Sequence, residues 1–333
     1  MPTIPADVPD GLDADSRQIR QDLRPIADLM ENPHVTEIKV RGGGRHVFAE
    51  EHGICRLLPG RTFPNLVNAI RGIAGAVGRD VSKHAPRLEA RLETYDARLS
   101  AVLPPVARGG AWCTIRRFPA RYTLDELVGI DMLSAARAHA LRDLVRRKQT
   151  LLVSGEPGAG KTTLLAALLR EIPHEDHVCV IEKEGELVSD NPYVCFLETA
   201  DAFEVYDPSR PARKPTTMAD LVYILLRHSP GRIVAGEVRG EEAEAVLMAM
   251  NTGHPGSLLT LHANSARDAL WRLARLAMQS RPNVSHESAL MDVGAAIHGV
   301  IHLSKERGRR TVAEVLTVNG YSIPAHEFTF VPM

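Results

Sequence analysis

Short apolar segments alternate with amphipathic segments through the second half of the chain. TLLVSG, HVCVIE, GRIVAGEV and SLLTLHA are almost continuously apolar, and helical spacing marks TTLLAALLREI, EEAEAVLMAMN and SARDALWRLARLAMQ between and after them. This alternation is typical of a parallel sheet covered by helices on both faces. We therefore predict an α/β domain over residues 149–333, which ends in a hairpin with Gly308 in its turn.

The first third of the chain has a different rhythm. Strand-like segments such as VTEIKV, HVFAE, ARLSAVLPP and AWCTIRRF surround one amphipathic helix, FPNLVNAIRGIAGAVG, and Gly42–Gly44 supply a tight turn. The pattern predicts a smaller α+β domain over residues 21–118. A flexible lead-in rich in Pro and Asp is expected before it, over residues 1–20, and a linker with one helix after it, over residues 119–148.

Composition excludes a disordered, fibrous or membrane-spanning chain. Hydrophobic residues make up 44% and charged residues 24%, which is ordinary for a globular protein. No apolar run approaches the roughly 18 to 20 residues of a spanning helix, and no basic segment followed by an apolar one suggests export. We therefore expect a cytoplasmic protein without a transmembrane segment, and peripheral attachment to the inner membrane stays open.

The charge balance gives no reason to expect a polyanion as partner. Lysine and arginine total 40 against 41 acidic residues, a net charge of −1, so no bulk field draws nucleic acid. One local basic cluster is interpreted as the solvated face of the linker helix, so direct nucleic-acid binding is not expected; it comprises Arg142, Arg146, Arg147 and Lys148.

The cysteines are scattered without a C-x-x-C pair, and three of the four lie in apolar, strand-like segments. Soft-metal sites need closely spaced ligands, so we interpret these residues as reduced core thiols. They are Cys55, Cys113, Cys179 and Cys195.

The strongest chemical signal is GEPGAGKT, which follows an apolar strand and precedes a helix. Glycines let the backbone N–H groups of such a loop point at phosphate oxygens, its lysine reaches the terminal phosphates, and its threonine hydroxyl binds Mg²⁺. The motif therefore predicts ATP and Mg²⁺ binding, with Thr162 as a metal ligand. The predicted nucleotide-binding residues are Gly155, Glu156, Pro157, Gly158, Ala159, Gly160, Lys161, Thr162 and Thr163.

A phosphate loop needs an acid on a neighbouring strand to hold Mg²⁺ and to activate the attacking water. GRIVAGEVRG supplies Glu237 at a strand end, one residue after Gly236, the position where many proteins with this loop have aspartate. We predict Glu237 as catalytic base and metal ligand. Arg239 is predicted to balance phosphate charge. A surface glutamate and a surface ion pair are the competing interpretations.

Two further segments place polar residues at strand ends. In HVCVIEKEGEL, Glu182, Glu184 and Glu186 could order water or metal, or could form an exposed acidic turn. In GHPGSLLTLHANS, His254 and His262 flank a strand and are too far apart to be expected to share a metal ion. If that strand lies beside the phosphate loop, His262 could donate to the terminal phosphate and sense its presence.

As a set, GEPGAGKTT, IEKEGEL, LLRHSPGRIVAGEVRGEEA and NTGHPGSLLTLHANS resemble, in order and content, the motifs of the secretion-ATPase superfamily. Within it the chain is most similar to conjugative-transfer ATPases of the TrbB type, from about residue 23 to residue 318. The resemblance implies a C-terminal RecA-like P-loop domain after a smaller PAS-like α+β domain. It also implies that Glu182 and Glu186 belong to the nucleotide site, that Glu237 is the Walker B acid, and that His262 senses phosphate.

The family resemblance further implies a hexameric ring that hydrolyses ATP to power a conjugation or type IV secretion machine. Inner-membrane components of that machine would be its partners. Arg116 and Arg98 are implied to reach phosphate from the first domain, and Arg227 and Arg232 to lie near the site. Two alternatives stay open: a nucleotide-gated assembly platform with incidental turnover, and a DNA-translocating RecA-like motor.

The sequence departs from the family pattern at Lys183, where relatives commonly have aspartate. A lysine in place of an acid puts the metal-binding role of the IEKEGEL segment in question. The chain also lacks the paired C-x-x-C motifs of many type II secretion relatives, which favours the type IV and conjugation branch.

Overall fold

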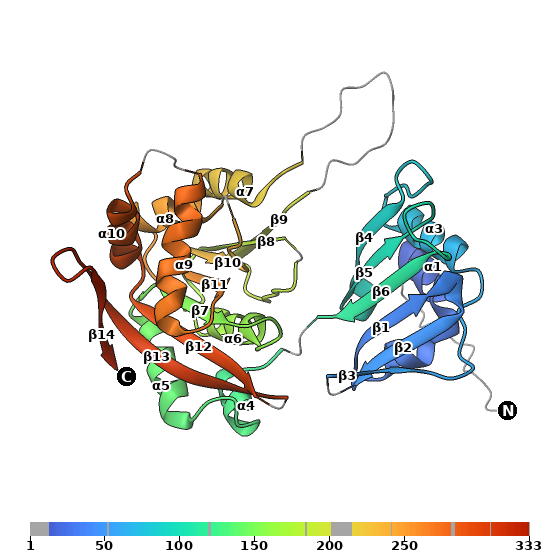
Figure 1. Cartoon of the computed structure of the whole chain (residues 1–333), viewed down its shortest axis with the longest axis horizontal. Helices are drawn as coiled ribbons and strands as arrows, with labels where there is room; N and C mark the ends of the chain where they lie inside the picture. The colour runs from blue at the N-terminus through green and yellow to red at the C-terminus, as the bar shows by residue number, and fades with distance from the viewer. Residues whose placement is uncertain are drawn as a thin grey trace, which may run out of the picture. The chain divides into compact units, whose positions relative to one another are not determined.

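The chain forms two units in the computed structural model, divided after Phe118 (Figure 1). The structure describes residues 13–51, 53–118, 121–183, 185–200, 215–240, 242–280, 284–306 and 308–332. Across these residues, the helices are too short or too polar for any of them to cross a membrane.

The first unit is built on a six-stranded antiparallel sheet with the order β3-β2-β1-β6-β5-β4. Buried and less buried residues alternate along β5, so one face of the sheet carries the core and helices α1 and α3 pack on that face (Figure 1). The elements are α1 Ala14–Asp22, η1 Arg24–Ile26, α2 Ala27–Glu31, β1 Val35–Arg41, η2 Gly42–Gly44, β2 His46–Glu51, β3 Ile54–Leu57, α3 Leu66–Ala76, β4 Arg87–Leu92, η3 Glu93–Tyr95, β5 Ala97–Val102 and β6 Trp112–Arg117.

Helix α1 lies in the segment predicted to be a flexible lead-in, so that prediction is wrong for Ala14 onward. The Asp13 carboxylate caps the helix by accepting from the Ser16 N–H. Ile19, Leu23 and Ile26 recur at helical spacing and are buried in the core of the first unit. This burial outweighs the local abundance of Asp and Pro, which had suggested an unpacked segment.

The second unit contains an eight-stranded sheet with the order β14-β13-β12-β7-β11-β10-β8-β9. The pairs from β12 to β9 are parallel, and β13 and β14 add antiparallel strands at the other edge. The strands are β7 Leu151–Gly155, β8 Val178–Glu182, β9 Val194–Glu198, β10 Arg232–Ala235, β11 Leu258–His262, β12 Gly299–Glu306, β13 Arg309–Ser322 and β14 Glu327–Pro332. The predicted α/β fold is confirmed, and β14 extends the predicted C-terminal hairpin.

Helices cover both faces of this sheet (Figure 1). Leu151 and Val153 face one core and Leu152 faces the other, as the twofold alternation of a strand requires. The helices on the first face are α4 Leu124–Gly129, α5 Ala135–Arg146 and α6 Lys161–Arg170. Those on the second face are α7 Met218–Leu225, α8 Glu242–Asn251, α9 Ala266–Gln279 and α10 His286–Ala296, with the short η4 Leu226–His228 after α7.

The segment predicted as linker and one helix contains two helices that belong to the second unit. Thr123 and Glu126 form a reciprocal capping box that starts α4. Leu124, Leu127 and Leu141 are fully buried beneath the sheet. The described part of this segment, from residue 121, is therefore part of the α/β domain, because its apolar residues complete one of that domain's two cores.

Candidate active site

The phosphate loop joins the end of β7 to the start of α6, as the motif predicts. Gly160 precedes the helix with φ +96°, a left-handed conformation that favours glycine. A Cβ at Gly155 would lie 2.6 Å from the carbonyl oxygen of Leu303 on the neighbouring strand. No side chain caps the first N–H groups of α6. This helix start is therefore suited to an anion, which the free N–H groups and the helix dipole both favour.

Lys161 is the first residue of α6 and is only 7% exposed. Its Nζ atom donates to the Glu156 carbonyl oxygen at 3.1 Å and lies 3.0 Å from His262 Nδ1. Burial lowers the pKa of Lys161, and the negative charge of Glu237 only partly opposes that effect. A buried ammonium whose hydrogen-bond partners are neutral is electrostatically undersatisfied, so a phosphate at the loop would stabilise it.

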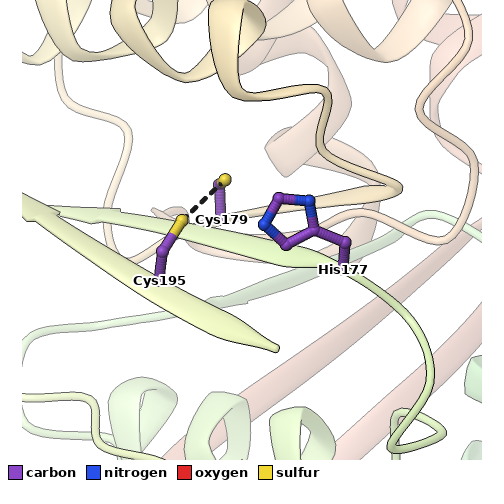
Figure 2. A group of neighbouring side chains, drawn as sticks. All are labelled: His177, Cys179 and Cys195. Carbon is purple, nitrogen blue, oxygen red and sulfur yellow. Dashed lines mark hydrogen bonds between the residues drawn. The ribbon is translucent and has the colours of Figure 1, made fainter. Parts of the chain in front are cut away.

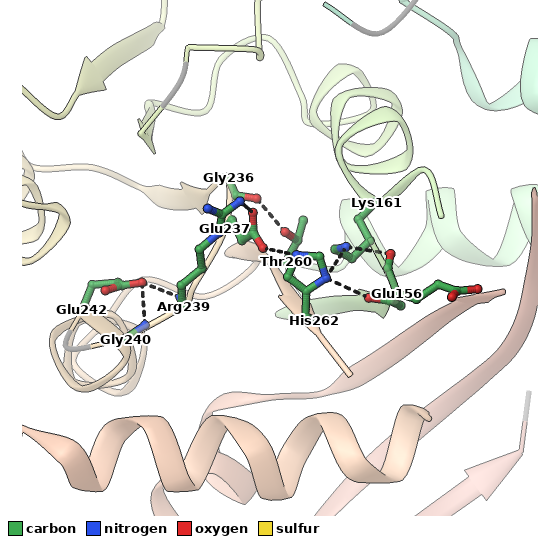
Figure 3. A network of polar contacts seen from close by, with 10 residues as sticks. Glu156, Lys161, Gly236, Glu237, Arg239, Gly240, Glu242, Thr260 and His262 are labelled. Carbon is green, nitrogen blue, oxygen red and sulfur yellow. Dashed lines mark hydrogen bonds and ion pairs between the residues drawn. The ribbon is translucent and has the colours of Figure 1, made fainter. Parts of the chain in front are cut away.

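Glu237 emerges two residues after β10 and lies at the centre of a polar network (Figure 3). Its Oε1 atom is 2.7 Å from His262 Nε2, and its Oε2 atom accepts from Arg239 Nη2 at 2.5 Å. The Arg239 side chain is 56% exposed, whereas that of Glu237 is 23% exposed. The carboxylate is therefore held between a half-exposed cation and a histidine next to the phosphate loop.

His262 ends β11, and in the sheet register it is the direct partner of Gly155 at the end of β7. Burial lowers the pKa of His262, and the positive charge of Lys161 lowers it further. The ring is therefore neutral at neutral pH. Because a carboxylate only accepts, Nε2 carries the proton toward Glu237. Nδ1 of the neutral ring then accepts from Lys161 at 3.0 Å, and its longer contact of 3.3 Å with the Gly155 carbonyl oxygen is not a hydrogen bond in this tautomer.

Glu182 ends β8, is 5% exposed, and accepts the backbone N–H of Leu187 at 3.0 Å. Burial raises the pKa of Glu182 to about 7; the hydrogen bond from Leu187 opposes this shift, and the charge of Glu186 adds to it. A Cβ at Gly236 would lie 2.8 Å from Glu182 Cγ. Glycine in place of the expected aspartate thus leaves room for an acid supplied by the neighbouring strand.

Thr162 and Glu186 line the same small pocket beside α6. The pocket brings the predicted metal-binding hydroxyl and the second predicted acid of the IEKEGEL segment to the same place. Lys183 is exposed, and Glu184 lies outside the described residues. The other lining residues are Arg121, Tyr122, Ala166, Arg170 and Val188.

Arg232 of LLRHSPGR is not beside this chain's phosphate loop, which corrects the prediction for that residue, whereas the place of Arg227 near the site stays a prediction. Arg232 begins β10, so it is about 16 Å of extended strand away from Glu237. It is fully buried, where its Nε donates to Asp176 Oδ2 at 2.8 Å and its Nη1 donates to the Val145 carbonyl oxygen at 2.6 Å. Arg227 lies in η4, which leads into the same end of β10.

Arg116 and Arg98 belong to the first unit, where they are direct cross-strand neighbours on β6 and β5. The Arg116 side chain is exposed. Their contact with phosphate stays a prediction.

Three further residues support the site and were not predicted. Arg310 on β13 donates from Nε to the Gly158 carbonyl oxygen at 2.9 Å. Thr260, the one hydroxyl residue of LLTLH, donates to the Gly236 carbonyl oxygen at 2.6 Å. The Glu242 carboxylate accepts the backbone N–H groups of Arg239 and Gly240 and so fixes the turn after Glu237. Only Thr260 carried a sequence signal, because it interrupts an apolar strand.

A phosphate loop between a parallel strand and a helix, with acids at the neighbouring strand ends, defines a P-loop ATPase. Residues 84–307 match the family described as type II/IV secretion system protein, and the chain belongs to that family. The resemblance found in the motifs is therefore confirmed.

Individual relatives agree with this assignment. The conjugal transfer protein TrbB of Rhizobium radiobacter is 29% identical over 296 residues, which cover 88% of this chain and 86% of that protein. The type IV secretion system protein VirB11 of Brucella suis is 29% identical over 286 residues, which cover 78% and 77%. The solved structure of the Legionella pneumophila ATPase DotB shares the fold, with a TM-score of 0.59 at 23% identity over 94% of this chain and 82% of that one.

Proposed function

We propose that this chain hydrolyses ATP in the presence of Mg²⁺ and, as a hexameric ring in the cytoplasm, drives a conjugation or type IV secretion machine. The observation that supports the proposal most is the convergence of Lys161, Glu237 and His262, which come from three different elements. The likeness to TrbB and VirB11 supports the biological setting.

The residues of the site fit a Mg-nucleotide. Gly160 has the left-handed conformation that turns the loop into α6, the start of α6 offers uncapped N–H groups, and Lys161 is a buried cation. Thr162 and Glu237 would hold Mg²⁺, whose charge would help to neutralise the phosphates during transfer. Glu182, which fills the space left by Gly236, is a further acid at the same sheet edge.

The chain's own residues have separable roles in this proposal. Lys161 exchanges its contacts with Glu156 and His262 for the terminal phosphates. Glu237 accepts a proton from the attacking water, and Arg239 orients that carboxylate until phosphate competes for the guanidinium. His262, released by Lys161, directs a ring nitrogen to the terminal phosphate.

Two other functions compete with this proposal. An assembly platform would bind ATP without needing a catalytic base, so the placement of Glu237 favours an enzyme. A DNA-translocating motor has less support, because the net charge is only −1.

Phosphate release by the full-length protein, with Mg-ATP and with ATP plus a chelator, tests hydrolysis. Light-scattering mass under the same two conditions tests the ring. We expect turnover only with Mg²⁺ and a six-fold protomer mass with nucleotide. Ring formation without turnover would support the platform instead, and turnover by a stable monomer would contradict the ring.

A further inference from the structure

Two cysteines that are far apart in the sequence are direct neighbours in the sheet. Cys179 on β8 and Cys195 on β9 are paired in the parallel register, and their Sγ atoms are 2.8 Å apart. The imidazole of His177 lies beside them (Figure 2), so that one ligand atom from each residue falls within 4.8 Å of the others. All four cysteines are free thiols, as interpreted from the sequence, but Cys55 is exposed, so the assignment to a core is wrong for that residue. Cys179 and Cys195, scattered in the sequence, are adjacent in the structure.

The orientation of His177 is suited to metal binding. Its Nδ1 atom is 3.2 Å from the Ser229 carbonyl oxygen, and because a carbonyl only accepts, Nδ1 carries the proton. The lone pair of the neutral ring is then on Nε2. Figure 2 shows this far ring nitrogen directed toward the two sulfur atoms. A backbone carbonyl that fixes the tautomer in this way is the usual support of a metal-binding histidine.

The cluster combines one buried sulfur with two partly exposed donors. Cys179 is fully buried, whereas His177 and Cys195 are partly exposed. An ion can therefore reach the cluster from the side of His177 and Cys195.

We propose that His177, Cys179 and Cys195 bind a thiophilic metal ion, Zn²⁺, with water as the fourth ligand. Two sulfur donors and one imidazole select Zn²⁺ over Mg²⁺, which prefers oxygen. Binding expels the two thiol protons and forms two Zn–S bonds and one Zn–N bond. Tetrahedral Zn–S bonds of about 2.3 Å require the Sγ atoms to lie about 3.8 Å apart, so they move apart by about 1 Å.

The proposed site fastens the edge strand β9 to β8 near the start of both strands. It is separate from the nucleotide site, because Glu182 lies three residues beyond Cys179, roughly 10 Å along β8. The His177 carbonyl oxygen also accepts the backbone N–H groups of Gly231 and Arg232, which ties the same position to the start of β10. Zn²⁺ would therefore stabilise the edge of the parallel sheet, and its binding does not require ATP.

The test uses full-length protein that has been reduced and freed of metal, without nucleotide. Zn²⁺ is titrated against a chromophoric chelator, and Co²⁺ is then used as a spectroscopic substitute. We expect one ion per chain, thiolate-to-cobalt charge-transfer absorption, and tetrahedral d–d bands. Cys179→Ser and Cys195→Ser should each lose the charge-transfer intensity of one sulfur. Each of these variants, and His177→Ala, removes a direct ligand and should weaken binding by at least about 100-fold, the upper end of what losing a group behind a ligand costs.

Matched controls are Cys55→Ser, which changes an exposed cysteine, and His139→Ala, which changes a histidine whose side chain is 76% exposed. Both should bind Zn²⁺ as the unsubstituted protein does. Wild-type protein and both controls should also gain thermal stability from one equivalent of Zn²⁺, even if a serine variant folds poorly.

Three results would overturn the proposal: no stabilisation of the wild-type protein by Zn²⁺, a cobalt spectrum without thiolate bands, or equal binding by Cys179→Ser. A Cys179–Cys195 disulfide in protein prepared without reductant, together with no Zn²⁺ binding after reduction, would also overturn it. None of these measurements depends on ATP hydrolysis, so their outcome is independent of the proposed function.

Discussion

A charged side chain lies at each end of strand β10, but the charges are paired differently at the two ends. At the start of the strand, fully buried Arg232 is paired with Asp176 at 2.6 Å and also donates to a backbone carbonyl. Burial tends to raise the pKa of Asp176, but hydrogen bonds from Lys148 and Arg232 outweigh it and lower the pKa overall. This end therefore satisfies its charges within the protein.

The other end leaves its charges incompletely balanced. Lys161 is buried with a lowered pKa, and Glu182 is buried with a pKa raised to about 7. Buried charges are costly unless they are paired, so an unbalanced set persists where a ligand completes it. Arg232 and Asp176 therefore stabilise the sheet, whereas Lys161 and Glu182 serve the site. The sequence alone does not distinguish these two roles, because all four are charged residues near strands.

The largest expected effect is on catalysis at the unbalanced end. Lys161→Ala removes the buried cation that faces the terminal phosphates and should lower ATP turnover by at least about 1,000-fold. It should also weaken ATP binding. Steady-state phosphate release and nucleotide binding measure the two effects, with Lys83→Ala, an exposed lysine of the first unit, as control. Turnover near the wild-type rate would exclude the phosphate-loop assignment.

At the balanced end, the expected effect is on stability. Asp176→Ala leaves the Arg232 guanidinium buried without its carboxylate and should lower the free energy of unfolding by about 3 to 5 kcal/mol. Urea unfolding measures this loss. Asp143→Ala, which breaks an exposed pair with His139, should cost less than about 1 kcal/mol. A loss of turnover by folded Asp176→Ala, without loss of stability, would contradict the separation between the two ends.

Glu182 should make stability depend on pH with an unusual sign. Its pKa is about 7 in the folded chain against an ordinary value of 4.5, so the folded state binds more protons between these values. Stability is therefore lost as pH rises from 4.5 to 7, by up to about 3 kcal/mol. Urea unfolding at pH 5 and pH 7.5 should show this loss in the wild-type protein and much less of it in Glu182→Gln. Identical pH profiles would place Glu182 in a solvated environment.

The smallest expected effect comes from the glycine beside Glu182. Gly236→Ala places a methyl group 2.8 Å from Glu182 Cγ and should cost about 1 to 3 kcal/mol through overpacking. Because the Glu182 side chain must shift, ATP turnover should fall, while the phosphate loop keeps its conformation. The double variant Gly236→Ala/Glu182→Ala should recover part of the stability. Without such recovery, the clash with Glu182 would not be the cause.

Local chemistry made the phosphate loop predictable, because strand, glycines, lysine and helix are contiguous in the sequence. Glu237 and His262 were also found, since Glu237 lies two residues after an apolar strand and His262 ends one. Arg310 and the Cys179–Cys195 pair were not, because their positions depend on which strands become neighbours in the sheet. Which strands become neighbours is decided by packing between residues that are far apart in the sequence.

Other errors had the same origin. Arg232 was placed near the site only by the family resemblance of LLRHSPGR, but the extended strand β10 puts Arg232 and Glu237 at opposite ends of the strand. Helix α1 was missed because the burial of Ile19 and Leu23 depends on a core formed by later strands. Sequence spacing thus predicted elements and motif residues better than it predicted their partners.

The most direct test of Glu237 as the catalytic base compares ATP binding and ATP cleavage in Glu237→Gln. The amide keeps the position of the carboxylate but cannot accept a proton from water, so ATP should bind within a few-fold of the wild-type affinity while single-turnover cleavage falls at least about 100-fold. Glu287→Gln, at an exposed glutamate of α10, serves as control and should cleave normally. Cleavage by Glu237→Gln at the wild-type rate would contradict the assignment of Glu237 as catalytic base.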